Sequence, residues 1–306
     1  MKKNIVMLMA AVIAVCGLTL GLVSSFGLNA KSKVKKENAV TASSGLVTRD
    51  FNLSAFEKIE VGGNFNVEFV QGALKSVTVT GPQYEMDHIT IEVKGSKLEI
   101  GFDEEYYKND KTFNGKNNKR SKSPVTVKMS APSVSLIDMS LSASFKASTL
   151  RHGGQLKLEA STSGKINLES VQCGSLSADA DTSGSIKIDE VQTSDADLDA
   201  DTSGSVYAKS LSSVKVKVDA DTSGSIKVDY LTGSNVVGSA DTSGKITLKG
   251  VVSTVSFTAD TSGYVDAGEL RAENATVRAD TNGKIKYCAR HTNAGSTSLI
   301  NTYKAD

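Results

Sequence analysis

The sequence predicts an all-β protein that folds as a parallel β-solenoid with about 20 residues in each coil. A Thr-Ser-Gly segment, once Thr-Asn-Gly, recurs with glycines that are 20 residues apart, or 19 in one case. Hydrophobic and polar residues alternate between the glycines, which is the pattern of short strands. Such repeats stack in parallel coils, because one coil cannot bury its own face. The glycines are Gly164, Gly184, Gly204, Gly224, Gly244, Gly263 and Gly283.

The columns of the repeat predict which side chains line the inside of the coil. Hydrophobic residues stand two positions after the glycine, at Ile166, Ile186, Val206, Ile226, Ile246, Val265 and Ile285. They also stand seven positions after it, at Val171, Val191, Leu211, Leu231, Val251 and Leu270. Alanine stands four positions before it, at Ala160, Ala180, Ala200, Ala220, Ala240, Ala259 and Ala279. We expect hydrophobic ladders inside the tube, the alanine at a narrow corner, and a glycine with positive φ at that corner.

The first 30 residues are typical of a secretory signal peptide. Two lysines precede an apolar run from Ile5 to Val23, and the small residue Ala30 ends the segment. Two alternatives stay open: the run is long enough to remain as an uncleaved anchor, or the chain is lipidated at Cys16. Residues 31–47 are expected to form a linker. All three alternatives predict an exported protein of the cell envelope, at the periplasm or cell surface, or a secreted one.

Residues 48–139 predict further β-structure with a looser pattern. Segments such as "FNVEFVQG" at 65–72 alternate in polarity, and glycines separate them at hairpin or corner spacing. Residues 48–102 show no helix signal. This part is expected either to continue the solenoid or to cap its first coil.

Residues 103–123 interrupt this pattern with a dense mixture of charges, Asn and Gly. We expect a solvated loop or long hairpin there. Tyr106, Tyr107 and Phe113 stand among six basic residues, so the alternative is a binding loop with exposed aromatic side chains.

Residues 140–290 hold the regular repeats, and their first copy is degenerate, with Ala143 in place of the glycine. Residues 291–306 lack the repeat and are expected to close the last coil. Cys173 and Cys288 are nearly six coils apart, which is about 25–30 Å along the axis. A disulfide needs Cα atoms within about 7 Å, so we expect two free thiols.

Charge and composition exclude one class of partner. The chain has 35 basic and 34 acidic residues, and removal of residues 1–30 takes away two lysines. The remaining 33 basic and 34 acidic residues give a net charge of −1. Nucleic acid is therefore not expected as a partner.

The tetrapeptide Asp181-Thr182-Ser183-Gly184 matches the segment that carries the catalytic aspartate of pepsin-like proteases. Such a site needs two aspartates from different lobes that share one proton. Here the aspartate recurs along the solenoid axis, at Asp181, Asp201, Asp221, Asp241, Asp260 and Asp280. We interpret the motif as a corner turn, and we predict no catalytic residue, no cofactor and no metal site.

Two further interpretations concern the same corner. The aspartates are expected to accept hydrogen bonds from backbone N–H groups of their own Ser-Gly turns; the alternative is a row of carboxylates that binds Ca²⁺. The threonines are expected to form an inward or corner ladder of hydroxyls bonded to one another. These are Thr162, Thr182, Thr202, Thr222, Thr242, Thr261 and Thr281.

The N-terminal strands resemble the start of a bacterial family, the "putative auto-transporter adhesin, head GIN domain" family. The features that carry the resemblance are Phe51, Phe56, Ile59, Val61, Gly62, the strand at 65–72, Gly81 and the strand at 94–100. The resemblance covers roughly residues 48–290. It implies an exported right-handed β-helix at the bacterial cell envelope with an adhesin-like role, and it brings no catalytic residues.

These observations favour a non-enzymatic cell-envelope protein, adhesin-like or a scaffold, that presents a repetitive Ser/Thr/Asp face. Its partner would be a surface protein or a glycan. Membrane contact is expected only through the N-terminal segment, if that segment is uncleaved. The alternative is a polysaccharide-binding or polysaccharide-degrading β-helix protein, which as an enzyme would need an acid/base cluster that interrupts the rows of one coil face.

Overall fold

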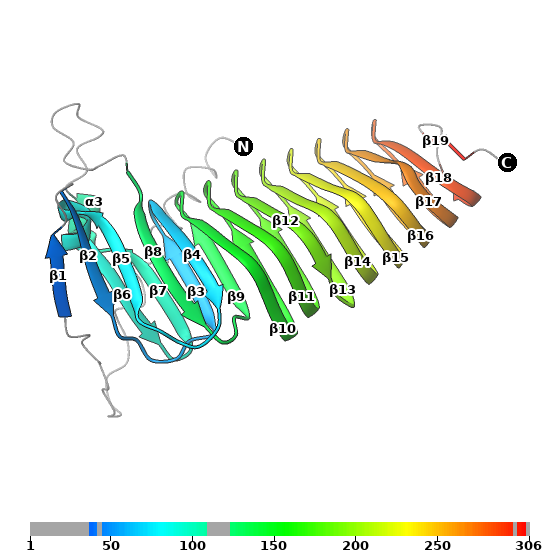
Figure 1. Ribbon diagram of the computed structural model, residues 1–306. Coiled ribbons are helices and arrows are strands. Elements are labelled where there is room, and N and C mark those ends of the chain that lie inside the picture. Colours follow the sequence, from blue (N-terminus) through cyan, green and yellow to red (C-terminus); the bar gives the residue numbers. More distant parts are fainter. Residues whose placement is uncertain (1–36, 42–44, 109–122, 296–298, 304–306) are drawn as a thin grey trace, which may run out of the picture. The chain divides into compact units, whose positions relative to one another are not determined.

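The structure is a computed structural model that describes residues 37–41, 45–108, 123–295 and 299–303. It is 71% strand and 4% helix, and it forms a β-solenoid of about eight turns with about 20 residues per coil (Figure 1). Residues 34–306 form one compact unit. The other unit, residues 1–33, lies outside the described residues, and the predicted signal peptide with Cys16 lies there too. In the described part, no helix is long and apolar enough to span a membrane.

The chain forms short strands first and long, bent strands afterwards. The short strands are β1 (Glu37–Thr41), β2 (Leu46–Phe51), β3 (Lys58–Gly62), β4 (Phe65–Gln71), β5 (Val77–Pro82), β6 (Ile89–Lys94), β7 (Lys97–Phe102), β8 (Val125–Ala131) and β9 (Leu136–Ser140). The regular coils contain β10 (Ser144–Ala160), β11 (Lys165–Ala180), β12 (Ser185–Gln192), β13 (Asp195–Ala200), β14 (Ser205–Ala220), β15 (Ser225–Ala240), β16 (Lys245–Ala259), β17 (Tyr264–Ala279), β18 (Lys284–Ala294) and β19 (Leu299–Asn301). Two short helices, α2 (Gln83–His88) and α3 (Glu104–Lys108), follow β5 and β7.

Each regular coil contributes to two sheets, which we call the first sheet and the second sheet. In β11, residues 165–172 belong to the first sheet and residues 175–180 to the second. Strands β12 and β13 divide their coil in the same way. Equivalent residues pair in parallel from coil to coil, so that Ile186 lies between Ile166 and Val206. Each side chain therefore stacks on its equivalents at the strand interval of about 4.8 Å.

The N-terminal part extends the same two sheets. In the first sheet, β4 pairs with β8, and antiparallel strands β5, β2 and β1 follow. In the second sheet, β9 pairs with β3 and β3 with β7 in parallel, and β6 pairs with β7 antiparallel. The N-terminal strands thus continue the solenoid sheets, and β1 lies within the segment that the sequence predicts as a linker.

Helix α2 corrects the expectation that residues 48–102 contain no helix. It follows Pro82 and connects β5 of the first sheet with β6 of the second. Met86 is fully buried, and the Arg49 guanidinium donates to the Met86 carbonyl oxygen and to the Asp87 carboxylate. A helix of six residues is too short to show a 3.6-residue pattern in the sequence.

The predicted hydrophobic ladders form the core, with one exception. Residues two positions after the glycine are at most 2% exposed throughout. Seven positions after it, Val251 is 59% exposed, so the prediction is wrong there. The coil with only 19 residues has lost a position before this point, and Gly250 rather than Val251 lies opposite Leu231. Gly250 has φ of 135°, and a Cβ on it would lie 2.0 Å from the Leu231 carbonyl oxygen.

The corner glycine has a different role from the predicted one. Positive φ falls on the two residues before it, with 45° at Thr202 and 69° at Ser203 in one copy. The Asp201 carbonyl oxygen accepts the Gly204 N–H at 2.7 Å, which closes the turn. A Cβ on Gly204 would lie 1.9 Å from the Ala180 carbonyl oxygen in the preceding coil. The glycine is required because two backbones approach each other closely.

The last strand, β19, packs on the final regular coil. β19 pairs with residues 285–287 of β18, and the Asn301 side chain bonds the backbone N–H and carbonyl of Ala289.

The two cysteines lie in distant coils. Cys173 lies opposite His152 in an early coil, whereas Cys288 lies opposite Arg271 near the end. Both are free thiols, as their separation along the axis predicts.

Candidate functional site

The repeated corners present aspartate, threonine and serine at the surface. In one corner the Thr222 N–H donates to the Asp221 carboxylate at 2.6 Å. Asp201, Asp241 and Asp260 accept the same bond. Each of these carboxylates is bonded within its own turn as predicted, although the donor is threonine rather than serine or glycine. The tetrapeptide shared with pepsin-like proteases is a turn that successive coils repeat.

The threonines lie at the corner but do not form the predicted ladder. Their side chains are exposed, and within the described residues no hydrogen bond joins their hydroxyls to one another. The Thr281 hydroxyl bonds Asp260 of the preceding coil instead, and this bond, with the Thr261 N–H, holds the pKa of Asp260 below its ordinary value.

Buried hydroxyls occur at the opposite bend of the coil. The Thr193 hydroxyl lies 3.1 Å from the carbonyl oxygens of both Gly174 and Asp195. The Ser213 hydroxyl occupies the equivalent position in the next coil and is 4% exposed as a residue. These hydroxyls satisfy backbone carbonyls where the chain passes from the first sheet to the second.

The first sheet carries a row of mixed charge on its outer side. The row consists of Lys128, Glu68, Lys146, Asn167, Lys187, Tyr207, Lys227, Thr247, Asp266 and Lys286, each opposite the next. The lysines of this row form ion pairs with two kinds of carboxylate. Some carboxylates belong to the row itself, and others stand two residues after a lysine on the same strand. Lys227 is 2.9 Å from Asp229, Lys128 is 3.5 Å from Glu68, and Lys286 is 3.7 Å from Asp266. The first sheet thus presents both signs of charge side by side.

Tyr207 links this row into a small network. Its hydroxyl donates to the Asp229 carboxylate at 2.7 Å, and the Lys227 ammonium lies 5.3 Å from its ring centre. Hydrogen bonds from Lys227 and then from Tyr207 hold the pKa of Asp229 below its ordinary value. Donors, acceptors and an aromatic ring therefore share one surface.

The second sheet carries a row of carboxylates that the sequence reasoning missed. Its members are Glu92, Glu99, Glu60, Asp138, Glu159, Asp179, Asp199 and Asp219, each opposite the next. We call this the carboxylate row. It continues without acids as Ser239, Thr258 and Arg278. The signal was present in the sequence, because the residue directly before the repeated alanine is acidic in four successive copies, at 159, 179, 199 and 219.

Lysines neutralise parts of the carboxylate row. Lys97 pairs with Glu60 at 2.6 Å and with Glu99 at 2.7 Å, and Lys94 also pairs with Glu99. Lys157 pairs with Glu159, and Lys217 with Asp219. Lysines therefore neutralise the negative charge of the row only at intervals. Three aspartates of the row lie between these ion pairs: Asp138, Asp179 and Asp199.

The three aspartates have raised pKa values for two reasons. Burial, and then the charge of neighbouring Glu159, raise the pKa of Asp138 to about 6. Burial, and then the charges of Asp179 and Asp219, raise the pKa of Asp199 to about 6. The pKa of Asp179 is raised by burial and by Glu159. Burial first, and stacking of like charges second, thus oppose ionisation of these three aspartates.

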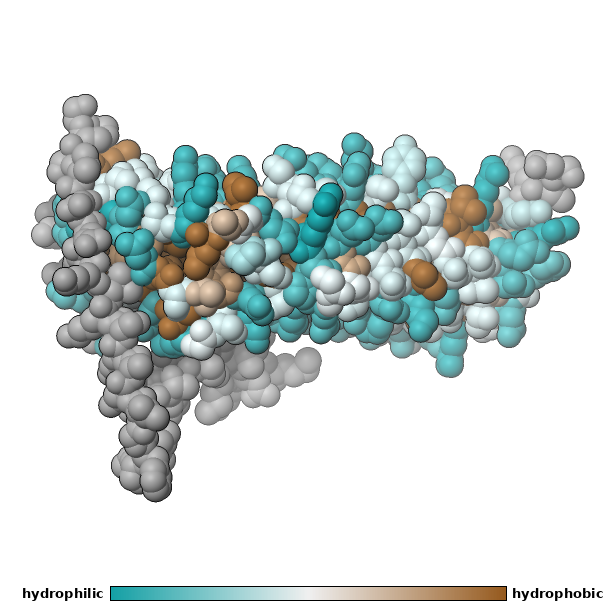
Figure 2. All heavy atoms as spheres, turned by 60° about the horizontal axis from the view of Figure 1, so that its bottom comes forward, coloured by the Kyte–Doolittle hydropathy of each residue, from teal (hydrophilic) through white to brown (hydrophobic). Residues whose placement is uncertain are grey.

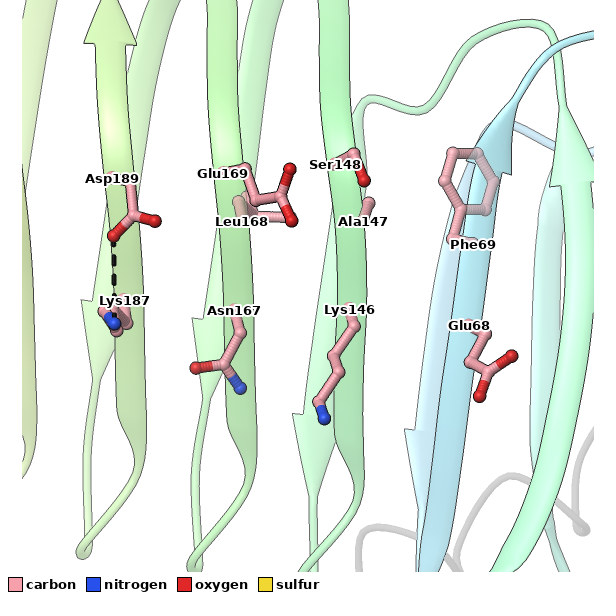
Figure 3. A pocket seen from close by; sticks show the side chains of 10 residues that line it. All are labelled: Glu68, Phe69, Lys146, Ala147, Ser148, Asn167, Leu168, Glu169, Lys187 and Asp189. Carbon is pink, nitrogen blue, oxygen red and sulfur yellow. Dashed lines mark ion pairs between the residues drawn. The ribbon is translucent and has the colours of Figure 1, made fainter.

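A shallow hollow lies on the first sheet where the regular coils meet the N-terminal part (Figure 3). Its volume is about 290 Å³. Buried Phe69, Ala147 and Leu168 are the apolar residues that line it. Polar residues form the rest of its lining: Glu68, Lys146, Ser148, Asn167, Glu169, Lys187 and Asp189. Figure 3 shows them at two levels across β4, β10, β11 and β12, with an ion pair of 3.8 Å between Lys187 and Asp189.

The base of the predicted loop at 103–123 is part of an aromatic cluster. Tyr106 is 6% exposed, and its ring stacks on Phe102 with centroids 4.0 Å apart. Asp103 accepts the Tyr106 N–H and lies 3.1 Å from His88 Nδ1. The expectation of an exposed aromatic is wrong for Tyr106, whereas Tyr107 is 46% exposed. Phe113 and residues 109–122 lie outside the described part.

The rest of the described surface is mainly polar. On the face shown in Figure 2, hydrophilic residues predominate; hydrophobic ones gather in one area toward the N-terminal end and lie in small, separate areas elsewhere. Exposed apolar side chains such as Val70, Val214 and Val251 belong to different coils. Within the described residues, no group of three or more His, Cys, Asp or Glu could hold a metal ion. Polar and charged rows are therefore the candidates for binding.

Comparisons with known proteins agree with this architecture. The sequence profile of the family described as "Putative auto-transporter adhesin, head GIN domain" matches residues 55–229 and 213–299. No curated protein matches the chain.

Three crystal structures have a similar fold. A "putative adhesin" from Parabacteroides merdae is 16% identical, with a TM-score of 0.55 over 87% of this chain and 97% of that one. A "putative adhesin" from Parabacteroides distasonis is 19% identical, with a TM-score of 0.55 over 84% and 96% of the two chains. A "putative lipid binding protein" from Parabacteroides distasonis is 17% identical, with a TM-score of 0.53 over 86% and 96%. At these identities the similarity shows the fold.

Proposed function

The chain belongs to the "putative auto-transporter adhesin, head GIN domain" family, and we propose that it is a non-enzymatic, exported protein of the cell envelope that binds a surface partner. The partner is a protein or glycan that contacts the outer side of the solenoid. The observation that carries this proposal is the set of long outward rows, in which polar side chains repeat from coil to coil. Rows of this kind offer one partner many equivalent contacts at an interval of about 4.8 Å.

The first sheet is the better candidate for the contact surface. Its outer side combines ammonium groups, carboxylates and amides with three tyrosines, Tyr207, Tyr230 and Tyr264. Tyr230 is 66% exposed, and tyrosine is among the residues that dominate binding energy at interfaces. The carboxylate row of the second sheet is mainly of one sign, so it suits fewer partners.

A cell-binding experiment tests the proposal. The purified protein is labelled and its binding to whole bacterial and host cells is measured by flow cytometry. We expect saturable binding that falls when Tyr207 and Tyr230 are both replaced by alanine. The matched control replaces Asn274 and Thr276 of the second sheet by alanine. Equal loss in both variants would contradict the choice of the first sheet, and absence of binding to any surface would contradict an adhesin-like role.

Export is tested separately. Fractionation of the native cells, followed by mass spectrometry of the N-terminus, distinguishes cleavage near Ala30 from lipidation at Cys16 and from a retained anchor. We expect the protein in the envelope or outside the cell. A protein found in the cytoplasm with an intact Met1 would contradict the proposal.

One observation favours a second candidate function, the degradation of a polysaccharide. In the hollow, Glu169 and Asp189 lie on adjacent strands, each one residue beyond the paired Leu168 and Ile188. Paired carboxylates are the residue types that glycosidases use, at a separation of about 5–5.5 Å in retaining enzymes. Release of reducing ends from polysaccharides by the wild-type protein, but not by Glu169→Gln or Asp189→Asn, would favour this function over adhesion. We expect no release.

A further inference from the structure

The first sheet is split between β4 and β10. Backbone pairing joins residues 66–68 of β4 to residues 144–146 of β10 and extends no further along these two strands. Beyond that point, β4 continues to pair with β8 through Gln71, and β10 continues to pair with β11. The pairing between these two strands therefore ends at Glu68 and Lys146 and does not resume at Val70 or Thr149.

A side chain closes the far end of the split. Gln71 accepts the Arg151 N–H at 2.7 Å and donates to the Arg151 carbonyl oxygen at 2.7 Å. It also donates to the Pro132 carbonyl oxygen at 3.0 Å. The Gln71 amide thus takes the place of a backbone pair, and the split has two fixed ends.

The hollow of Figure 3 includes one side of this split and extends across β10 to β11 and β12. Phe69 and Ala147, from its two sides, are buried at the hollow, and Phe69 stacks on Phe145 with ring centroids 5.6 Å apart. Carboxylate, ammonium, amide and hydroxyl groups surround the opening, on Glu68, Lys146, Asn167 and Ser148. The hollow therefore offers carboxylate, ammonium, amide and hydroxyl groups together with a small apolar surface.

We propose that this hollow, lined by residues of β4, β10, β11 and β12, is a saccharide-binding site. The proposal rests on the adhesin-like function and identifies the partner of the first sheet as a glycan. A sugar hydroxyl both donates and accepts hydrogen bonds, so it is matched by mixed donors and acceptors within reach of one another. The apolar surface at Phe69, Ala147 and Leu168 suits the C–H groups of a sugar ring.

The geometry favours a saccharide over an extended peptide. A peptide that joined the sheet would need a free edge of several residues on one strand. Here the open edge of β4 ends at Gln71, whose side chain already bonds Arg151. The hollow is open to solvent and holds about 290 Å³, so a sugar unit within a longer chain can enter from the side.

Two variants test the site without altering the core. Asn167→Ala removes the amide at the rim, and Ser148→Trp places a bulky side chain at the opening from an exposed position. Matched controls are Asn274→Ala on the second sheet and Ser212→Trp on the first sheet, both at exposed positions outside the hollow. Melting temperatures of all four proteins show whether the fold is retained.

The purified protein is screened on a glycan array, and its affinity for the saccharides that bind is measured by calorimetry. We expect Asn167→Ala and Ser148→Trp to weaken binding by about tenfold or more, the equivalent of one or two hydrogen bonds. The controls should stay within about twofold of the wild-type protein, since they lose no contact with the ligand. The cell-binding experiment is repeated with the same four variants.

The outcomes separate this inference from the adhesin-like function. Cell binding that is unchanged by both hollow variants would overturn the saccharide site and leave the function intact. A protein that binds peptides and not glycans on arrays would overturn the site as well. Saccharide binding that is lost in the two hollow variants would support the site even if whole-cell binding, and with it the proposed function, failed.

Discussion

The two sheets of the solenoid share one inner architecture and differ in the charge on their outer sides. On the first sheet, lysines stand beside carboxylates and neutral polar side chains, and the Lys227 and Tyr207 hydrogen bonds hold the pKa of Asp229 below its ordinary value. On the second sheet, eight acidic residues stack in succession and the pKa of Asp199 rises to about 6. Burial and neighbouring like charges therefore oppose the ionisation of Asp199 on one side, whereas hydrogen bonds from Lys227 and Tyr207 favour the ionised form of Asp229 on the other.

The difference shows how a solenoid separates stability from surface chemistry. Inward columns such as the isoleucine ladder must remain apolar, because each coil buries its neighbours. Outward columns are free of this requirement and can carry opposite or equal charges. Like charges directly opposite each other destabilise a sheet by up to about 1 kcal/mol per pair. The carboxylate row is therefore an electrostatic cost that the core offsets.

The largest expected effect comes from breaking the corner that both sheets share. Gly204→Ala should lower the free energy of unfolding by about 3 kcal/mol or more, because its Cβ would overlap the Ala180 carbonyl oxygen. Chemical denaturation measures the change. Gly72→Ala is the control, since nothing lies within 4 Å of the Cβ that it adds. Equal stability of the two variants would mean that the close approach does not exist.

The carboxylate row should respond to neutralisation at its centre. Asp138→Asn and Asp199→Asn should each raise the free energy of unfolding at pH 7 by about 1 kcal/mol, after allowance for solvent screening. Both groups have pKa values of about 6 in the folded protein. Denaturation at low and high salt checks the origin of the gain, which should shrink as salt increases.

The pH dependence follows from the same two groups. Asp138 and Asp199 have higher pKa values in the folded protein than in the unfolded chain, so their protonation stabilises the fold. This stabilisation is complete below about pH 4 and is lost as the pH rises through about 6. The wild-type protein should therefore become more stable as the pH falls from 7 to 5. The double variant Asp138→Asn/Asp199→Asn should lose most of this rise. Stability that falls between pH 7 and 5 in the wild-type protein would be the opposite result.

The equivalent change on the first sheet should have the opposite sign. Asp229→Asn removes the partner of Lys227 and Tyr207. We expect a loss of about 0.5 kcal/mol at pH 7, the usual size for an exposed ion pair. The pKa of Asp229 is lowered in the folded protein, so its contribution is present at neutral pH and disappears as the pH falls below 4. A gain in stability in Asp229→Asn would remove the contrast between the sheets.

The smallest expected effect on stability comes from the corner turn between the two sheets. Ser203 has φ of 69°, and the last copy of the turn has Asn282 at the equivalent position with φ of 68°. Because asparagine adopts positive φ more readily, Ser203→Asn should raise stability by about 0.3 kcal/mol. Ser225→Asn, at an outward strand position, should not. A thermal-shift comparison of the two variants is sufficient.

The sequence predicts the repeated part of the fold and most of its core, because every coil repeats the same columns. The register error at Val251 arises where one residue is missing, since spacing alone does not show where in a coil a deletion falls. The sequence predicts positive φ for the corner glycine, and this role is wrong, because positive φ falls on the two residues before it. Sequence patterns report which residue type is needed, whereas the reason, here the approach of Ala180, is visible only between coils.

The candidate site was less predictable. The carboxylate row includes Glu60 and Asp138, which lie in strands outside the regular repeat and join the row only through sheet pairing. The hollow depends on a split between β4 and β10, two strands that are far apart in the sequence. The acidic residues before the alanines of the regular coils could have been found by aligning the repeats, whereas the other contacts required the fold.

The central claim is that burial and stacked like charges oppose the ionisation of the central aspartates of the second sheet, whereas pairing with Lys227 and Tyr207 favours the ionisation of Asp229 on the first sheet. The most direct test is an NMR titration of the side-chain carboxyl carbons of Asp199 and Asp229 in the folded protein. The account predicts a pKa of about 6 for Asp199 and a value below the ordinary one for Asp229. Values that coincide, or a lower pKa for Asp199 than for Asp229, would contradict it.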